Sequence, residues 1–395
     1  MSTAMPLELD RDRARDLLEY FQSRRREVLA LTRALVEQES PSGDLDGSRA
    51  VVQLLSESAQ SVGAVSSLER IEAADNYGEH LRVRAFTKAD PDARAILILG
   101  HTDTVHPRGS LRQRPWRESD GKIYGPGVFD MKAGCAAALE ALRACDALGI
   151  TPRRPVVLLL TCDEETGSFS GRALVEEEAR RAEYVLVLEP PATGGRAKTA
   201  RKGTGMFTLS VEGRAAHAGL EPEKGTSAVL EIARQIARLD GLNDAATGTT
   251  VNVGVVSGGT RSNVVAAEAR AEIDVRFGTI EEARRVEEAI RSLTAFDSRA
   301  RLSIEGEINR PPMERTSAVA ELYRRARAIA AALDFELGET SVGGASDGNF
   351  AAACGAAVLD GLGIDGDGAH ADDEHIDADA VTRRGALLAA LLGTL

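Results

Sequence analysis

Histidine and acidic residues follow three short apolar runs in the first half of the chain. The runs show no polar alternation, which is typical of strands buried on both faces of a parallel sheet. They cover residues 95–99, 155–160 and 184–188, and within a few residues come His101, Glu164 with Glu165, and Glu189. In open α/β sheets the carboxyl ends of the strands form the rim at which ligands bind. Together with Asp103 and Asp130, these residues have the donor types of a two-metal hydrolase site.

The composition indicates a soluble enzyme of more than one domain. The chain has 395 residues, more than a typical single core accommodates, and its formal net charge of −13 argues against a nucleic-acid partner. Its N-terminal segment is charged, and no stretch approaches the roughly 20 apolar residues of a membrane span. The four cysteines lack CxxC spacing, so we expect buried free thiols. These features predict a cytoplasmic protein.

The order of helical and extended patterns changes twice along the chain. Up to Glu189 helical stretches alternate with apolar strands, as in an α/β layered domain. From Gly205 the order becomes strand, helix, strand, strand, helix, strand, which is the order of a ferredoxin-like unit. The elements predicted there are strands over 206–211, 250–256, 269–277 and 301–307, and helices over 226–239 and 281–293. We therefore expect a catalytic domain of residues 1–203 and 311–395, interrupted by an inserted domain of residues 204–310.

Six motifs in this order carry a resemblance to a known family. They are His101-Thr102-Asp103-Thr104-Val105, the segments 125–134 and 161–168, Leu188-Glu189-Pro190, Ala216-His217-Ala218-Gly219 and Gly368-Ala369-His370. With them the chain resembles the M20 family of zinc peptidases, within its glutamate carboxypeptidase-like branch. The resemblance implies an α/β catalytic domain with a mixed sheet flanked by helices, and an inserted ferredoxin-like domain that serves as lid and dimerisation surface. It also implies a homodimer.

The resemblance implies two Zn²⁺ ions per chain, with Co²⁺ or Mn²⁺ as alternatives. A co-catalytic pair sits about 3.5–4 Å apart, so one ligand must reach both ions, and a carboxylate has two oxygens for this purpose. By resemblance the bridging ligand is Asp130, His101 and Glu189 complete one ion, and Glu165 and His370 complete the other. In many relatives the peptide bond after the bridging aspartate is cis.

Two further acidic residues are expected to act in proton transfer and in orienting a ligand, rather than to bind the metal ions directly. Glu164, beside a ligand, is expected to be the general base that takes a proton from the attacking water and passes it to the leaving amine. Asp103 is suited to accept the free N–H of His101 and to fix its tautomer. Each motif alone has an ordinary explanation: His-x-Asp is commonly a surface pair, and Glu164-Glu165 resembles a solvated helix start. His80, His106 and His375 are interpreted as exposed or structural, with His375 a weak rival to His370.

Residues of the inserted domain and its borders are candidates for substrate binding. His217 matches a histidine that stabilises the tetrahedral intermediate in relatives, with a structural histidine as the alternative. Arg276 and Asn263 match positions that bind a free C-terminal carboxylate, for which the Arg fork is well shaped. Arg310, and one of Lys198, Arg201 or Lys202, are candidates for a substrate side-chain acid, with a surface role equally open.

The sequence thus predicts a two-zinc amidohydrolase that removes a C-terminal amino acid, with glutamate preferred, from an N-acyl or peptidyl substrate. The alternatives are an acetylornithine- or diaminopimelate-type deacylase or an aminoacylase. A non-catalytic metal-binding protein is a further alternative, against which the intact Glu164 argues.

Overall fold

The computed structural model describes residues 10–88 and 93–395, which divide into two compact units. Unit 1 comprises the chain up to Ala200 with residues 315–342 and 346–395. Unit 2 comprises residues 201–314 with 343–345. Each unit has its own hydrophobic core.

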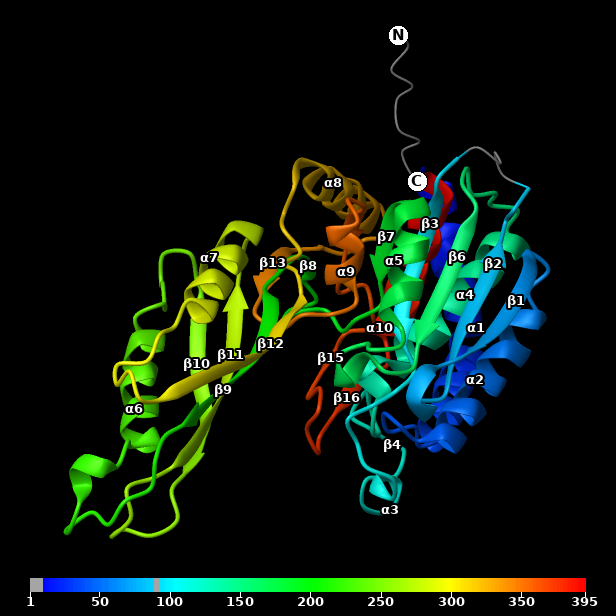
Figure 1. The fold of residues 1–395 in the computed structure, drawn as a ribbon. Helices are drawn as coiled ribbons and strands as arrows, with labels where there is room; N and C mark the ends of the chain where they lie inside the picture. Colours follow the sequence, from blue (N-terminus) through cyan, green and yellow to red (C-terminus); the bar gives the residue numbers. More distant parts are fainter. Residues whose placement is uncertain (1–9, 89–92) are drawn as a thin grey trace. The chain divides into compact units, whose positions relative to one another are not determined.

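A six-stranded mixed sheet forms the centre of unit 1 (Figure 1). Its strands, in spatial order, are β1 (Val65–Glu72), β2 (Glu79–Ala85), β6 (Val156–Thr161), β3 (Ala95–His101), β7 (Ala182–Val187) and β14 (Ala357–Leu359). The last four run parallel to one another, whereas β2 is antiparallel to both β1 and β6. β6 is buried along its whole length, as expected of a strand covered on both faces.

Helices cover both faces of this sheet. They are α1 (Arg11–Glu37), α2 (Leu45–Gln60), α4 (Ala133–Ala147), α5 (Arg172–Arg181), α8 (Ser317–Ala332), α9 (Gly348–Ala353) and α10 (Ala380–Thr394). α1, α4 and α10 pack against one another, and α5, which packs on α9, lies on the opposite face of the sheet (Figure 1). α1 is capped at its start by Asp10, and its buried Leu17, Phe21, Val28 and Leu35 recur at helical spacing.

Short elements connect the sheet to the loops of unit 1. The helical turns are η1 (Ala74–Asn76), α3 (Ser110–Gln113), η2 (Val128–Lys132) and η3 (Glu164–Thr166). A small sheet contains β4 (Arg117–Ser119), β5 (Lys122–Tyr124), β16 (His375–Asp377) and β15 (Gly366–Asp367), and a two-stranded sheet pairs β8 (Ala197–Arg201) with β13 (Glu339–Val342). The small sheet matters for the site because it brings the segment before β16 beside the segment after β5.

Unit 2 is a four-stranded antiparallel sheet with two helices. The strands are β9 (Gly203–Glu212), β10 (Thr250–Gly258), β11 (Glu268–Phe277) and β12 (Arg301–Arg310), in the spatial order β10-β11-β9-β12. The helices are α6 (Ala228–Asp240) and α7 (Ile280–Arg291), and a turn, η4, spans Pro222–Lys224. Alternate residues of β9 and β11 are buried, so one face of this sheet forms the core with the two helices. The element order is the one predicted from Gly205 onward.

The mixed sheet flanked by helices confirms the predicted fold class, but several boundaries differ. The sequence pattern predicts a helix over residues 28–37 and a strand over 81–87. The helix, α1, begins at Arg11, and the strand is β2, Glu79–Ala85. β1 was not predicted, because its pattern is mostly exposed or half-buried and lacks regular alternation.

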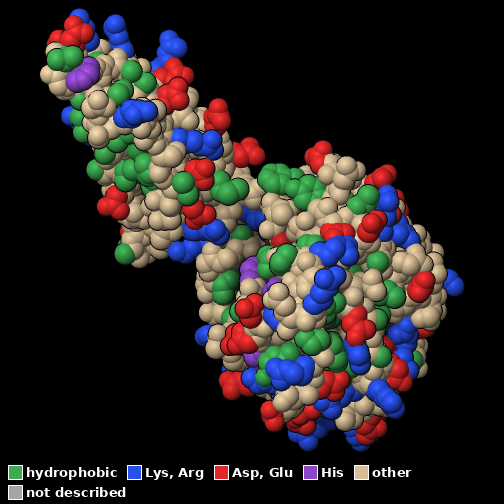
Figure 2. Space-filling view, turned by 90° about the horizontal axis from the view of Figure 1, so that it is seen from below, with side chains coloured by type: hydrophobic (Ala, Val, Ile, Leu, Met, Phe, Trp, Pro, Cys, Tyr) green, Lys and Arg blue, Asp and Glu red, His purple; other side chains and the backbone are tan. Residues whose placement is uncertain are grey.

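Figure 2 shows Lys and Arg side chains interspersed with Asp and Glu over the face it presents.

Candidate active site

Three neighbouring parallel strands of unit 1 end at one edge of the sheet and place the first candidate ligands there. β3 ends at His101, which pairs in register with Thr161 at the end of β6. β7 ends at Val187, and Glu189 follows it by two residues. Glu164 lies in η3, just beyond β6. The hydrophobic pattern of the strands therefore determines where these three side chains meet.

Four of the five candidate ligands lie around the fifth, Asp130. Its Oδ1 lies 3.1 Å from His101 Nε2, whereas its Oδ2 lies 3.4 Å from His370 Nε2. His101 Nε2 is also 3.6 Å from Glu189 Oε1, and His370 Nε2 is 3.2 Å from Glu165 Oε2. Each oxygen of Asp130 thus faces a different imidazole, and each imidazole has a second carboxylate beside it.

The charge balance of this cluster fits divalent cations. Burial alone would lower the pKa of His101, but hydrogen bonds to Asp103 and Asp130 raise it well above its ordinary value. Hydrogen bonds to Asp130 and Glu165 raise the pKa of His370 to about 10. Burial would raise the pKa of Asp130, but the same two imidazoles hold it below its ordinary value. The carboxylates therefore require positive charge at the two imidazole positions, which protons or cations supply.

The donor set also fits a metal pair. Ligand atoms of His101, Asp130 and Glu165 lie within 4.8 Å of one another, as do those of His101, Glu164 and Glu189. Within the described part of the chain, Glu165 Oε1 is buried and accepts no hydrogen bond. Imidazole nitrogens with carboxylate oxygens are ligands that Zn²⁺ accepts. His370 is half-exposed, so the cluster has one side open to solvent.

Asp103 connects the histidine to the acidic pair. Its carboxylate accepts hydrogen bonds from Ser42 Oγ at 2.6 Å and from the backbone N–H groups of Glu164 and Glu165, both at 3.2 Å. His101 Nδ1 lies 3.0 Å from the Asp103 carbonyl oxygen and 3.4 Å from its carboxylate. The nearer acceptor for the imidazole is thus the main chain, which the sequence did not indicate. The side chain instead fixes the segment that carries Glu164.

Asp130 lies in η2, where the backbone departs from helical geometry and the Asp130–Met131 peptide bond is cis. The turn before it requires glycine at 127, whose φ is 72° and where a Cβ would lie 2.5 Å from Thr104 Cγ2. Lys132, after the turn, donates to Leu35 O at 2.9 Å and Gln38 O at 2.8 Å at the end of α1. Burial lowers the pKa of this lysine to about 8.

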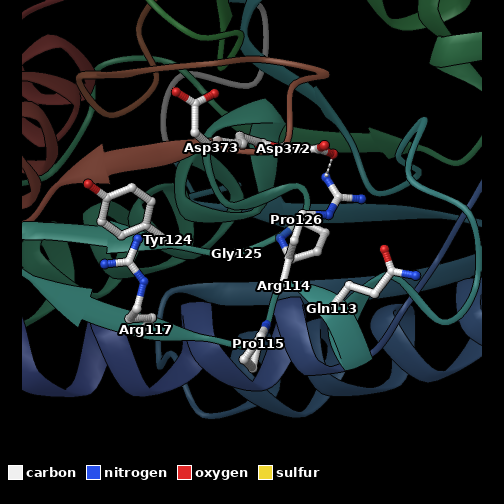
Figure 3. Close-up of a pocket in the computed structure, with 10 residues that line it drawn as sticks. Gln113, Arg114, Pro115, Arg117, Tyr124, Gly125, Pro126, Asp372 and Asp373 are labelled. Atoms are coloured by element: carbon white, nitrogen blue, oxygen red, sulfur yellow. Dashed lines mark ion pairs between the residues drawn. The ribbon is translucent and has the colours of Figure 1, made fainter.

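A buried carboxylate missed by the sequence reasoning supports the same turn. Glu374 accepts hydrogen bonds from the backbone N–H groups of Gly127, Phe129 and Asp130 and from His106 Nε2. A cavity of about 340 Å³ lies beside it, lined by residues that include Arg114, Tyr124, Gly125 and Asp372 (Figure 3). A sequence signal for Glu374 was available, because this residue follows His370 by four positions in the same loop.

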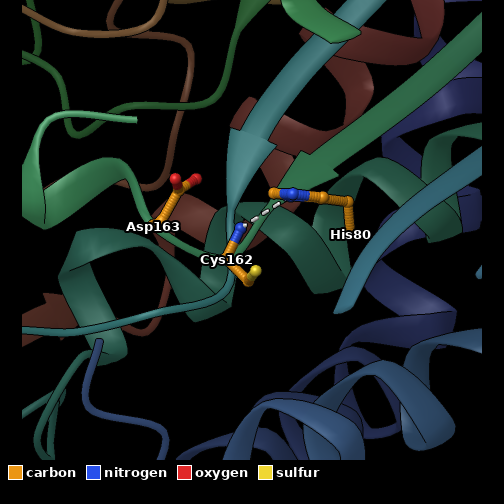
Figure 4. Close-up of side chains that lie close together, drawn as sticks. All are labelled: His80, Cys162 and Asp163. Carbon is orange, nitrogen blue, oxygen red and sulfur yellow. Dashed lines mark hydrogen bonds between the residues drawn. The ribbon is translucent and has the colours of Figure 1, made fainter. Parts of the chain in front are cut away.

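His80, Cys162 and Asp163 form a second group with possible ligand atoms (Figure 4). Both ring nitrogens of His80 are engaged: Nδ1 accepts from Cys162 N–H at 3.3 Å, and Nε2 lies 3.1 Å from Ser170 Oγ. Ser170 in turn donates to Asp163 Oδ2 at 2.9 Å. Burial lowers the pKa of His80. The hydrogen-bond pattern therefore identifies a neutral structural histidine rather than a ligand.

The three histidines interpreted as exposed or structural are all buried. His106 bonds to Glu374, and His375 Nδ1 donates to Asp373 O at 2.8 Å. The exposed alternative is therefore wrong, and the structural one holds. The four cysteines are free thiols, three of them buried and Cys354 partly exposed.

Three of the candidate substrate residues, His217, Asn263 and Arg276, lie within unit 2 away from its borders. His217 is exposed, and its Nδ1 accepts from the backbone N–H groups of Gly219 and Leu220. Asn263 lies nearby, since its carbonyl accepts from Ala218 N–H at 3.0 Å. The fork of Arg276 already binds a carboxylate, because Nε and Nη2 donate to the two oxygens of Asp274 at 2.8 and 2.9 Å. That pairing was not predicted.

The remaining candidates are the basic residues at the borders of the two units. Arg310 and Lys198 are both buried rather than on the surface. The backbone of Lys198, in unit 1, pairs with Asp360. Arg201 donates to Gly344 O at 3.1 Å, and the Lys202 ammonium donates to Gly248 O. The surface alternative for Lys198 and Arg310 is therefore wrong, while their binding role stays a prediction.

Comparison with known proteins decides the family. Residues 97–394 match the sequence profile of Peptidase family M20/M25/M40. The chain belongs to this family. The M20 membership confirms the resemblance on which the motifs were interpreted, and it makes the chain a hydrolase that is expected to use a divalent metal.

Relatives differ in their named activities. Carboxypeptidase G2 of Pseudomonas sp. (strain RS-16) is 28% identical over 347 residues, which cover 85% of this chain and 81% of that protein. Acetylornithine deacetylase of Proteus mirabilis (strain HI4320) is 31% identical over 195 residues, or 46% of this chain and 49% of that protein. The M20 relatives thus include both a carboxypeptidase and a deacylase.

Solved structures share the fold at low sequence identity. Aminopeptidase PepT from Bacillus cereus ATCC 10987 superposes with a TM-score of 0.80 at 23% identity, covering 94% of this chain and 98% of the other. The M20 family metallo-carboxypeptidase Sso-CP2 from Sulfolobus solfataricus superposes with a TM-score of 0.70 at 15% identity, covering 93% of this chain and 99% of the other.

In the described part of this chain, no helix has the length and apolar character needed to cross a membrane.

Proposed function

We propose that this M20 hydrolase is a two-zinc amidohydrolase that removes a C-terminal amino acid, with glutamate preferred, from N-acyl or short peptidyl substrates. The observation that carries the proposal is the position of Asp130, whose two oxygens face His101 and His370 separately. Because Glu189 and Glu165 lie beside those imidazoles, the residues form two donor sets with one shared carboxylate. Co²⁺ or Mn²⁺ would fit the same donors.

The residues that would hold the cations are His101, Asp130 and Glu189 for one, and Asp130, Glu165 and His370 for the other. When bound, divalent cations polarise the scissile carbonyl and lower the pKa of a coordinated water. Glu164 is held near this cluster by the hydrogen bond from its N–H to Asp103. In the proposed mechanism, its carboxylate takes the proton of the attacking water and returns it to the nitrogen of the leaving amine.

The proposal gives unit 2 two roles, in substrate binding and in dimerisation. By resemblance, His217 would stabilise the tetrahedral intermediate as a hydrogen-bond donor; its Nδ1 accepts hydrogen bonds from the backbone, so Nε2 carries the proton. Lid closure would exclude water. The proposal includes domain boundaries at residues 203–204 and 310–311. It also includes a cytoplasmic location, which the free cysteines favour.

Recognition of the C-terminal residue is assigned to Arg276 and Asn263, and recognition of an acidic side chain to Arg310 or Lys198. The similarity to carboxypeptidase G2 supports a carboxypeptidase. Because Asp274 holds the Arg276 fork, a substrate carboxylate must displace Asp274 or bind the edge of the guanidinium that Asp274 leaves open. The similarity to acetylornithine deacetylases favours a deacylase as the second candidate.

A panel of N-acyl amino acids tests the proposed specificity. We expect Arg276→Lys to lower kcat/KM for a substrate with a free C-terminal carboxylate by roughly ten- to a thousandfold, or about 1.4–4 kcal/mol, because lysine keeps the charge and loses the bidentate fork. Wild-type enzyme should hydrolyse the C-terminal amide of the same substrate poorly, and the variant should barely distinguish the two.

The matched control is Arg270→Lys, which makes the same change on the same strand, where Arg270 also faces an acid two residues away. It should leave kcat/KM near the wild-type value. Equal kcat/KM for C-terminal Glu and C-terminal Ala would refute the glutamate preference and favour the deacylase or aminoacylase, with the metal chemistry unaffected.

The proposed homodimer has a testable surface in unit 2. β10 is an edge strand of its sheet, and Val255 and Val256, beside an irregularity in its register, are 53% and 52% exposed. An apolar exposed edge is suited to pairing with a second chain. We expect Val255→Asp with Val256→Asp to give a monomer in analytical ultracentrifugation, whereas Leu148→Asp, at an exposed apolar position of unit 1, should remain a dimer. A wild-type chain that sediments as a monomer would contradict the dimer.

A further inference from the structure

Two of the proposed ligands are not positioned by the central sheet. His101 closes β3, but Asp130 lies in η2, where φ and ψ depart from helical values. His370 lies in a loop and has a positive φ of 66°. His370 Nε2 and Asp130 Oδ2 nevertheless lie 3.4 Å apart, which suits two ligands of one cation. The pairing of β5 with β16 brings their segments side by side, and side-chain contacts add to that pairing.

The buried carboxylate of Glu374 makes these contacts. Its Oε1 accepts from Phe129 N–H at 2.9 Å and from Asp130 N–H at 3.0 Å. Its Oε2 accepts from Gly127 N–H at 2.9 Å and from His106 Nε2 at 2.5 Å. Four donors thus share two oxygens, and the side chain is 2% exposed. Because Glu374 follows His370 by four residues, this carboxylate joins the loop of one ligand to the turn of the other.

The partner of Glu374 is itself held in one tautomer. Arg114 Nη1 donates to His106 Nδ1 at 3.3 Å, so the proton of the neutral ring lies on Nε2, which donates to Glu374. Arg114 also donates to Ala371 O at 3.3 Å and pairs with Asp372 at 3.2 Å (Figure 3). Arg114 therefore binds the loop of His370 directly at Ala371 and Asp372, and it also binds this loop through His106 at Glu374.

The loop that carries Glu374 has little packing on the side that faces the cavity. Gly125, Pro126 and residues 372–374 line the cavity of about 340 Å³, which lies at the surface beside exposed Asp372 and Asp373 (Figure 3). A loop beside a cavity lacks the dispersion contacts that fix a packed segment. The turn that carries Asp130 is itself packed, because Val128, Phe129 and Met131 are buried in the core. The hydrogen bonds to Glu374 therefore join a packed turn to a loop that borders a cavity.

We infer that Glu374 is a positioning residue that fixes Asp130 relative to His370 for cation binding; this inference rests on the proposed two-metal site. Glutamine at 374 would turn an NH₂ group toward two of the four donors and leave them buried without an acceptor. Because Asp130 is shared, displacement of its turn weakens binding of both cations. Partners one step removed from a metal are typically worth 10–100-fold in affinity, and we expect a loss of about that size for each cation.

The test uses the full-length chain without metal and two measurements. Zinc affinity is determined by competition with a chromogenic chelator, and hydrogen exchange of the segment 125–130 is followed by mass spectrometry. In Glu374→Gln we expect faster exchange of this segment and about 10–100-fold weaker zinc binding. Asp373→Asn is the matched control, because it removes the same charge from the neighbouring, exposed side chain. It should match wild type in both measurements.

Two further variants keep the test decisive if Glu374→Gln does not fold. Glu374→Asp keeps the charge but is one methylene shorter, so it should bind zinc with an affinity between wild type and Gln. His106→Phe removes one donor of four and should have a smaller effect. Exchange and zinc affinity like wild type in the Glu374 variants would overturn the inference while the two-metal site stands. A wild-type chain without stoichiometric zinc binding would instead refute the proposed function.

Discussion

Replacing Glu164 by glutamine is expected to lower kcat by roughly 10²–10⁴-fold while the chain retains both cations. The reason is that the amide occupies the same volume as the carboxylate but cannot accept the proton of the attacking water. The N–H of residue 164 would still donate to Asp103, so the segment should stay in place. Turnover of an N-acyl glutamate and zinc content by mass spectrometry measure the two effects separately.

Glu165→Gln is the matched control, since it makes the same change one residue along the chain. Glu165 Oε2 lies 3.2 Å from His370, so this variant should lose or weaken one cation rather than only the proton transfer. The geometry makes the comparison necessary, because ligand atoms of Glu164, His101 and Glu189 also lie within 4.8 Å of one another. If Glu164→Gln loses a cation, Glu164 is a ligand and the proposed roles must be exchanged.

The sequence predicted those parts of the site that depend on local patterns. The apolar runs of β3, β6 and β7 are continuous, so their identity as buried strands, and hence the common edge where His101 and Glu189 lie, follows from hydrophobicity alone. The ferredoxin-like order of unit 2 was predictable for the same reason, since its core strands alternate buried and exposed residues. The family motifs identified which acids to consider as ligands.

Contacts between distant segments were not predictable from one sequence. Glu374 bonds to N–H groups 244 to 247 residues away, and no periodicity relates a glutamate to a turn at that separation. The burial of His106 follows from the same contact. The pair Asp274 and Arg276 is different, because residues two apart on a strand point to the same face, so the occupied fork could have been anticipated from spacing.

Asp130→Asn is expected to have the largest effect on metal binding, because both proposed cations depend on this one side chain. Its Oδ1 and Oδ2 face His101 and His370 respectively, so replacing one oxygen by an NH₂ group removes a ligand atom from one cation and negative charge from both. We expect zinc content to fall from two to below one per chain, with turnover lost in parallel. Equilibrium dialysis against a zinc buffer, followed by elemental analysis, measures this loss.

His370→Gln provides the comparison that gives the Asp130 result its meaning. His370 is half-exposed and faces Asp130 Oδ2 and Glu165 Oε2, so its loss should affect one cation and leave His101, Asp130 and Glu189 to hold the other. The expected zinc contents are therefore about one for His370→Gln and below one for Asp130→Asn. Equal zinc contents in these two variants would contradict a shared carboxylate. Full retention of two cations by Asp130→Asn would exclude Asp130 as a ligand and leave its central position to be explained by its hydrogen bonds to the imidazoles.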